Sequence, residues 1–186
     1  MLEQILTYDK ELLMLINGAH NQVVDVIMVF ISSKLGWLPL YVFLIFIIAK
    51  DYGRKTWLVL VIVGLTVLLS DQISVQLFKN VFLRLRPCHE ESLSGLLHLV
   101  KSCGGKYGFI SSHATNSFSI TTLVILLLRN KHIWIWPVML IYGLLIIYSR
   151  VYLGVHYPTD VIAGSVVGIA IGTSTYFLFK YLKNFI

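Results

Sequence analysis

Long uncharged and mostly apolar stretches recur along the chain, with charged residues between them. Five of these stretches run for 15 to 19 residues. A helix needs about 20 residues to cross the hydrocarbon core of a bilayer, with a range of roughly 17 to 25. The shorter stretches reach that length where polar residues at their ends face a protein-lined cavity or extend toward the headgroups. The pattern therefore predicts membrane-spanning helices at 35–49, 56–70, 114–128, 133–149 and 161–179.

The N-terminal region carries a different, amphipathic pattern. Apolar residues between positions 2 and 16 recur every three or four residues, with charged residues between them. Asn17 and Gly18 then form a pair that typically ends a helix. We predict a helix over 2–16 that lies in the membrane interface. Segment 23–33 forms either a second interfacial or half-inserted helix or a sixth span.

The composition agrees with a membrane-embedded chain. Hydrophobic residues make up 57% of the 186 residues and charged residues 13%, whereas a soluble domain has about 25% charged residues. The net charge of +6 would suggest nucleic-acid binding in a soluble protein. In a chain this apolar it indicates membrane topology and an anionic substrate, so we expect no nucleic-acid partner. The expected fold is an all-α integral membrane protein, one domain over 1–186, with a bundle of five to six transmembrane helices and an interfacial segment over 1–33.

The short loops and the tail indicate the orientation in the membrane. With five spans, seven cations fall on one side, and the positive-inside rule makes that side cytoplasmic. The long segment 80–111 and the stretch 149–160 then share the opposite face, which is periplasmic or extracellular. The seven cations are Lys50, Arg54, Lys55, Arg129, Lys131, Lys180 and Lys183.

Three clusters of polar residues fall on that opposite face. Lysine and arginine side chains bind phosphoryl oxygens, and an arginine can hold two oxygens at once. Backbone amides at a helix N-terminus add partial positive charge. Two histidines, one followed by a carboxylate four residues on, suit a nucleophile and a general acid. Together these residues favour a phosphate site. The sequence has no group of carboxylates, cysteines or histidines at the spacing of metal ligands. The clusters are Lys79 with Arg84, Arg86 and Pro87; Ser111 with Ser112 and His113; and Ser149 with Arg150, His156 and Asp160.

The three clusters resemble the motifs of a known family. Residues 79–87 read KNVFLRLRP and fit K-x6-R-P; residues 149–160 read SRVYLGVHYPTD and fit S-R-x5-H-x3-D. Residues 110–113 read ISSH and resemble P-S-G-H. In this order over 79–160, the motifs resemble those of the type 2 phosphatidic acid phosphatases, the membrane branch of the acid phosphatase and vanadium haloperoxidase superfamily.

The resemblance implies a role for each motif residue. His156 attacks phosphorus and becomes a transient phosphohistidine, and Asp160 accepts a hydrogen bond from its other ring nitrogen. His113 protonates the leaving oxygen and then activates water. The family needs no metal or other cofactor. The phosphoryl oxygens are held by the side chains of Lys79, Arg86, Arg150 and Ser111 and by the amides of Ser112 and His113.

The second motif departs from the family pattern, because Ile110 replaces proline and Ser112 replaces glycine. Glycine at such a position allows a positive φ or a close backbone approach. We expect either that Ser112 reaches a similar conformation or that the turn differs, and its hydroxyl is a further donor.

Two charged residues outside the strict motifs are left with two interpretations each. Arg84 is either an interfacial anchor or a contact to a second phosphate or headgroup. Asp71, inside an apolar helix, either supports the site or makes a polar contact between spans.

Cys88 and Cys103 both fall in the long non-cytoplasmic segment. We hypothesise a disulfide, which an oxidising compartment permits; the alternative is two unpaired thiols. Closing a loop of about 15 residues contributes roughly 3 kcal/mol in the chain-entropy model.

The expected activity is hydrolysis of a lipid phosphate monoester or diphosphate at the outer face of the cytoplasmic membrane. Family frequency ranks undecaprenyl diphosphate ahead of phosphatidylglycerol phosphate, phosphatidic acid and lipid A phosphate. A lipid phosphotransferase using the same phosphohistidine is one alternative, and a transporter or headgroup-binding scaffold is another. The expected partners are the lipid substrate and membrane lipids, with no obligate protein partner.

Overall fold

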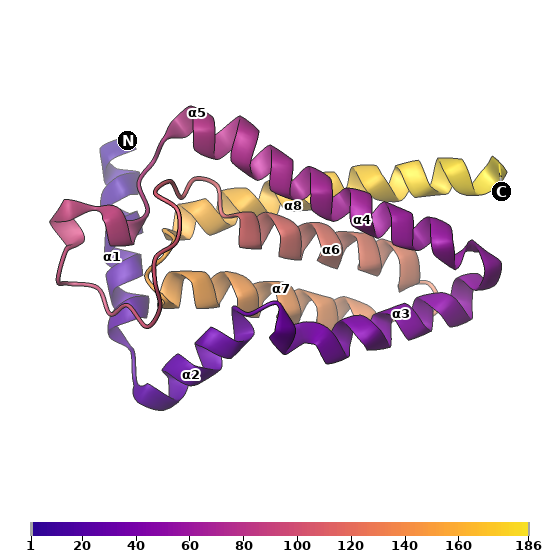
Figure 1. Cartoon of the computed structure of the whole chain (residues 1–186), viewed down its shortest axis with the longest axis horizontal. Helices are drawn as coiled ribbons and strands as arrows, with labels where there is room; N and C mark the ends of the chain where they lie inside the picture. The colour runs from indigo at the N-terminus through magenta and orange to yellow at the C-terminus, as the bar shows by residue number, and fades with distance from the viewer. Residues whose placement is uncertain (1, 186) are drawn as a thin grey trace.

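The computed structural model describes residues 2–185, so the outermost residues of the predicted domain, 1 and 186, lie outside the described residues. The described chain is helical and has no strand, apart from one isolated bridge between Leu85 and Tyr107. Long helices form a bundle, and the N-terminal helices lie at one end of it (Figure 1). The long helices are α1 (Leu2–Gly18), α2 (Gln22–Ile31), α3 (Leu38–Tyr52), α4 (Thr56–Gln72), α6 (Ser112–Leu128), α7 (Ile135–Tyr152) and α8 (Pro158–Leu182).

Shorter helical segments join these helices. Two of them, η3 and α5, extend α4 toward the end of the bundle where α1 lies (Figure 1). The short segments are η1 (Leu35–Trp37), η2 (Gly53–Lys55), η3 (Ile73–Lys79), α5 (Asn80–Phe82), η4 (Pro87–His89), η5 (Glu91–Leu93) and η6 (Lys183–Phe185).

Within residues 2–185, three helical segments are long and apolar enough to cross a membrane: Leu35–Phe82, Ile135–Tyr152 and Pro158–Phe185. The first contains both α3 and α4, and the chain reverses direction at η2 between them (Figure 1). The pair α1 and α2 is bent by 116° and counts as a fourth span only if taken together, while α6 is a shorter apolar helix. The predicted all-α membrane fold is confirmed, and the number of five or six spans stays a prediction.

Helices α6 and α8 pack so closely that only glycine fits on α8. A Cβ atom at Gly164, Gly168 or Gly172 would lie 2.8, 2.5 or 2.4 Å from a carbonyl oxygen of α6. Small residues spaced four apart allow such close contact between membrane helices. The contact places the first turn of α8 beside the first turn of α6, where the second and third motifs meet. The carbonyl groups belong to Ser111, Thr115 and Ser119.

The rest of the bundle has a conventional apolar core and an apolar exterior. Buried side chains from α3, α4, α6, α7 and α8 form one cluster. Outward-facing side chains are also apolar, as at Phe46 and Val166, which are 64% and 62% exposed. Apolar side chains on both faces of a helix are typical of a bundle that lipid surrounds.

The predicted N-terminal helix forms as α1 and ends at Gly18. It lies across the end of the bundle (Figure 1) and packs on α7 and α8. The side chains of Asp9, Leu13 and Asn17 are buried in this contact. Its position in the membrane interface stays a prediction. The second predicted helix, over 23–33, forms as α2.

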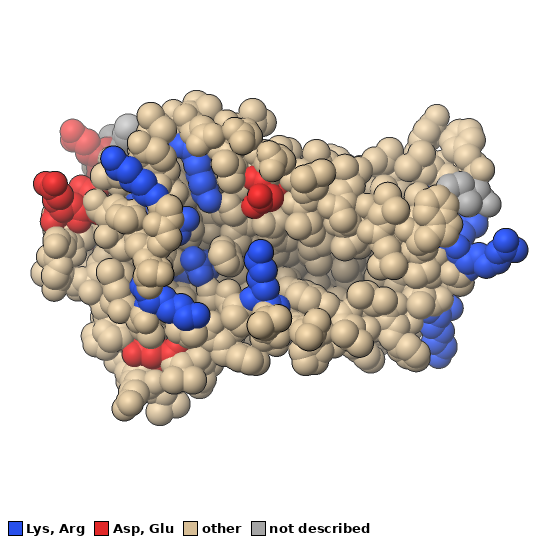
Figure 2. Space-filling view, in the orientation of Figure 1, with Lys and Arg blue, Asp and Glu red and all other residues tan. Residues whose placement is uncertain are grey.

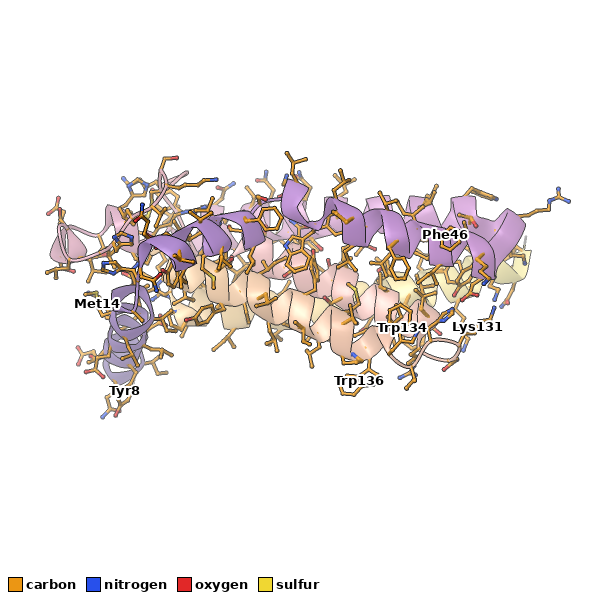
Figure 3. All side chains as sticks on the ribbon, turned by 90° about the horizontal axis from the view of Figure 1, so that it is seen from below. Tyr8, Met14, Phe46, Lys131, Trp134 and Trp136 are labelled. Atoms are coloured by element: carbon orange, nitrogen blue, oxygen red, sulfur yellow. A yellow bond between two sulfur atoms is a disulfide. The ribbon has the colours of Figure 1, made fainter. Side chains whose placement is uncertain are left out.

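The opposite end of the bundle carries the basic loops. Segments η2 and η6 and the connection between α6 and α7 all lie there (Figure 1). Trp134 and Trp136 project from the start of α7 near Lys131 (Figure 3) and are 40% and 48% exposed. Tryptophan beside lysine is typical of a membrane–water boundary. Basic side chains gather at both ends of the face shown in Figure 2. Between them, the half of this face nearer the C-terminus shows no charged side chain.

Candidate active site

The three sequence motifs converge at the end of the bundle where α1 lies. Each motif contributes side chains from a helix end or from a loop next to a helix. Lys79 ends η3, Arg86 follows α5, Ser111 caps α6, Ser112 and His113 begin α6, Arg150 lies in the last turn of α7, His156 precedes α8, and Asp160 lies in the first turn of α8.

His156 and Asp160 form a buried pair. Their side chains are 1% and 0% exposed, and Nδ1 of His156 lies 3.4 Å from Oδ2 of Asp160. Helix α8 begins at Pro158, so His156 lies in the bend before the helix and Asp160 reaches back to it from the first turn. The amide of Tyr157 donates to the same oxygen at 3.0 Å. Because a carboxylate only accepts hydrogen bonds, this contact places the proton on Nδ1 and leaves Nε2 free.

The surroundings of His156 keep its imidazole neutral. Burial lowers its pKa well below 6.5, and the nearby charges of Arg86, Arg150 and Lys79 lower it further. Burial also lowers the pKa of the Arg86 guanidinium, against the opposing effect of Asp160. A neutral ring with a free Nε2 has a lone pair available for attack on an electrophile.

Lys79 reaches the start of α6 from a π-helix, η3, which is seven residues long. Its Nζ donates to Oγ of Ser112 at 2.6 Å, and Oγ of Ser74 lies 2.7 Å from the same oxygen. π-helical turns are rare and occur frequently at functional sites. Among the described non-glycine residues only Leu83 has a positive φ, so Ser112 begins α6 with ordinary helical geometry and its hydroxyl engages Lys79.

The two motif arginines are held by contacts outside the helices. Arg86 donates from Nε to the carbonyl of Tyr107 at 3.3 Å and from Nη1 to that of Cys103 at 3.1 Å. Arg150 donates from Nη1 to the hydroxyl of Ser32, which caps α2. Nε of Arg150 is buried and has no partner among the described residues.

Ser111 and the cysteines organise the surrounding backbone. Ser111 is fully buried and caps α6, its Oγ accepting from the amide of Ala114 at 3.5 Å. Cys88 and Cys103 are joined in a disulfide with their Cα atoms 6.0 Å apart. Because the carbonyl of Cys103 also accepts a hydrogen bond from Arg86, this disulfide lies beside Arg86.

A cavity at the start of α6 adjoins a second cavity within the bundle. A cavity of about 160 Å³ is lined by Ser112, His113 and Asp71 among others, which places Asp71 beside the site. A larger, mainly apolar cavity of about 360 Å³ lies between α3, α4, α6 and α7. The two share Lys34, Tyr41, Asn116 and Tyr142 as lining residues.

The contacts of Arg84 differ from both roles that we considered for it, an interfacial anchor and a contact to a second phosphate or headgroup. Its guanidinium binds Asp160 and Asp9 within the protein. Asp9 was not identified from the sequence as a candidate site residue. The available signal was its spacing, because Asp9 falls among the apolar positions of the amphipathic pattern, where the buried face of α1 forms.

Comparison with known proteins identifies the family. The model of the PAP2 superfamily matches residues 55–184. A lipid A 4'-phosphatase from Porphyromonas gingivalis is 36% identical over 98% of this chain and 78% of its own length. An undecaprenyl-diphosphatase from Sulfolobus acidocaldarius is 33% identical over 89% of this chain and 76% of its own.

A solved structure has the same fold. The crystal structure of a transmembrane PAP2-type phosphatidylglycerolphosphate phosphatase from Bacillus subtilis aligns with a TM-score of 0.70. It is 21% identical and covers 98% of this chain and 88% of that one. The chain is therefore an integral membrane phosphatase and belongs to the PAP2 superfamily.

Proposed function

We propose that this phosphatase hydrolyses a lipid phosphate or diphosphate without a metal, through a phosphohistidine at His156. The observation that carries the proposal is the buried, neutral His156 paired with Asp160 and placed among Lys79, Arg86 and Arg150. Three cations around a neutral nucleophile suit a reaction that adds negative charge to phosphoryl oxygens in the transition state.

The first step transfers the phosphoryl group to the protein. Nε2 of His156 attacks phosphorus, a P–N bond forms, and the P–O bond to the lipid breaks. Burial and the charge of Arg150 lower the pKa of His113 to about 3 in the free protein. The bound phosphate anion offsets the nearby cations, so His113 takes up a proton in the complex and gives it to the departing oxygen. Asp160 stabilises the positive charge that develops on the His156 ring through its contact with Nδ1.

The second step returns the protein to its starting state. Neutral His113 takes a proton from water, and the hydroxide formed attacks the phosphohistidine. The P–N bond breaks, its electron pair returns to Nε2 of His156, and phosphate leaves. With a diphosphate substrate, the product of the first step is the lipid monophosphate.

We place the site on the non-cytoplasmic face of the membrane. The seven cations of the short loops and tail belong to the opposite end of the bundle, and the positive-inside rule assigns that end to the cytoplasm. A disulfide beside the site is consistent with an oxidising compartment.

A polyprenyl diphosphate such as undecaprenyl diphosphate stays our first prediction for the substrate. The apolar cavity that adjoins the one lined by Ser112 and His113 suits its chain. A lipid A 4'-phosphate is the second candidate, since the lipid A 4'-phosphatase relative matches 98% of this chain at 36% identity.

The decisive experiment measures phosphate release from a panel of lipid phosphates by purified protein in the presence of a chelator. The panel contains undecaprenyl diphosphate, lipid A phosphate, phosphatidylglycerol phosphate and phosphatidic acid. We expect His156→Ala to lower the rate by about 10³-fold or more, as removal of a nucleophile does. His132→Ala is the matched control, because His132 pairs with Asp51 at the other end of the bundle.

Three outcomes would contradict the proposal. Phosphate release that survives in His156→Ala excludes that nucleophile, and release that stops with chelator excludes the metal-free mechanism. Transfer of phosphate to an added lipid acceptor, with none to water, makes the protein a phosphotransferase.

A further inference from the structure

Helix α1 places a buried carboxylate against the start of α8. Asp9 is 3% exposed. Its Oδ1 accepts from the amide of Thr159 at 2.8 Å, and its Oδ2 accepts from the Thr159 hydroxyl and from Nη2 of Arg84 at 2.6 Å. A buried carboxylate is costly unless charge and hydrogen bonds satisfy it, and Asp9 has both.

Arg84 links this carboxylate to the one that contacts His156. While Nη2 binds Asp9, Nη1 donates to Oδ1 of Asp160 at 2.9 Å. The guanidinium carbon lies 4.1 Å from the centre of the Tyr157 ring. A planar guanidinium with two carboxylates and an aromatic face has little freedom to rotate.

Each oxygen of Asp160 has its own partners as a result. Oδ1 binds Arg84, while Oδ2 accepts from the amide of Tyr157 and faces Nδ1 of His156. The plane of the carboxylate is therefore set from both sides. Its orientation sets the ring of His156 in turn, because the ring tautomer follows the hydrogen bond made by Nδ1.

We propose that Asp9 and Arg84 are positioning residues, which hold Asp160 so that it orients His156 for attack. Helix α1 thereby completes the active site in addition to covering the end of the bundle. This inference rests on the proposed phosphohistidine mechanism. Neither residue contacts the reacting atoms, so their effect passes through Asp160.

The test uses the full-length protein with Asp9→Asn and Arg84→Lys. Asparagine keeps the shape and one acceptor but removes the charge, and lysine keeps the charge but cannot bridge two carboxylates. Asp51→Asn is the matched control, because Asp51 pairs with His132 and Lys131 at the other end of the bundle. The measurements are kcat and KM for the preferred lipid of the panel, and Ki for orthovanadate and for inorganic phosphate.

The two inhibitors distinguish a loss of positioning in the active site from a smaller amount of folded protein. Orthovanadate adopts five-coordinate geometry and resembles the transition state, whereas inorganic phosphate resembles a ground state. A Ki does not depend on the fraction of protein that is folded. We expect each variant to lower kcat by about 10- to 100-fold and to raise Ki for vanadate by a similar factor. KM and Ki for phosphate should stay within about twofold, and Asp51→Asn should match the wild type.

Wild-type kinetics in both variants would overturn the inference and leave the proposed function intact. A fall in kcat with an unchanged Ki for vanadate would also overturn it, because a loss of active protein alone gives that result. If Asp9→Asn fails to fold, Arg84→Lys decides by the same criteria. Absence of phosphate release by the wild type, or full activity in His156→Ala, would overturn the proposed function and this inference with it.

Discussion

The two ends of the bundle contain similar residues in different environments. At the α1 end, Asp160 contacts His156 and Arg84, and the Asp160 and His156 side chains are 0% and 1% exposed. At the opposite end, Asp51 contacts His132 and Lys131, and these three side chains are 13%, 27% and 62% exposed. An exposed ion pair contributes little because water screens it, whereas a buried carboxylate controls the orientation and protonation of its partner. Burial, and not residue identity, separates the pair that we propose to react from the pair at the other end.

The largest expected effect is on kcat, when the charge of Asp160 or of Asp51 is removed. Asp160→Asn should lower kcat by about 10³- to 10⁴-fold, because an amide at this position favours the wrong tautomer of the histidine. Asp51→Asn should change kcat by less than about twofold, since a screened surface pair does not orient a reacting group. Steady-state phosphate release at saturating substrate measures both. Equal losses in the two variants would remove the distinction between the ends.

A smaller effect on stability and kinetics is expected from substituting the glycines of α8, which lie at different distances from the site. Gly164→Ala and Gly172→Ala each push a Cβ into an α6 carbonyl, at 2.8 and 2.4 Å, and each should cost about 1–3 kcal/mol of stability. Only Gly164→Ala displaces Ser111, so only this variant should raise KM and lower kcat of the folded protein. Thermal unfolding in detergent and kinetics on the folded fraction measure the two properties.

Gly64→Ala is the control for the glycine experiment. Gly64 lies in α4 with no atom within 4 Å of the added Cβ. Its substitution should leave stability unchanged or raise it by about 0.5–1 kcal/mol. A loss of stability as large as that of Gly172→Ala would show that helix packing is not the cause.

The smallest expected effect is the pH dependence of stability. The pKa of His156 lies well below 6.5 in the folded protein, while an unfolded histidine binds a proton near its usual pKa of about 6.5. The unfolded state therefore binds more protons on acidification. The contribution of His156 to stability, fully present above pH 6.5, falls by about 1.4 kcal/mol per unit as the pH drops toward the folded pKa.

Replacement of the histidine tests this assignment. Between about pH 7.5 and pH 5.5, the unfolding midpoint of the wild type should fall further than that of His156→Gln. The matched variant His132→Gln should keep the steeper dependence of the wild type. Parallel curves for the wild type and His156→Gln would contradict the burial of a neutral imidazole.

Much of the fold follows from local pattern. The predicted stretch 56–70 forms as α4 (Thr56–Gln72), and 114–128 forms as α6 (Ser112–Leu128). Uncharged runs predict these helices because the backbone must satisfy its own hydrogen bonds in lipid. Helix boundaries differ by a few residues where caps decide them, as Ser111 does for α6.

The catalytic motifs were also readable, but their supporting contacts were not. His156 and Asp160 are four residues apart, and the start of α8 at Pro158 puts Asp160 in the first turn, from which it reaches back to His156. Asp9 and Arg84 are separated by most of the N-terminal half, and no spacing rule joins them. A charged residue among the apolar positions of α1 was the available signal for the contact between Asp9 and Arg84. The glycine spacing on α8 was another unused signal, because it predicts a close helix contact but not its partner helix.

The sequence by itself determined that this chain is a helical membrane protein with the motifs of a phosphatase, since hydropathy and short motifs act locally. Only the tertiary structure decided which carboxylate is buried against which histidine. It also decided that Arg84 joins Asp9 to Asp160, and that a π-helix brings Lys79 to Ser112. The physical reason is that burial and charge pairing arise from contacts between distant segments. Those contacts are set by the packing of α1, α6 and α8 against one another.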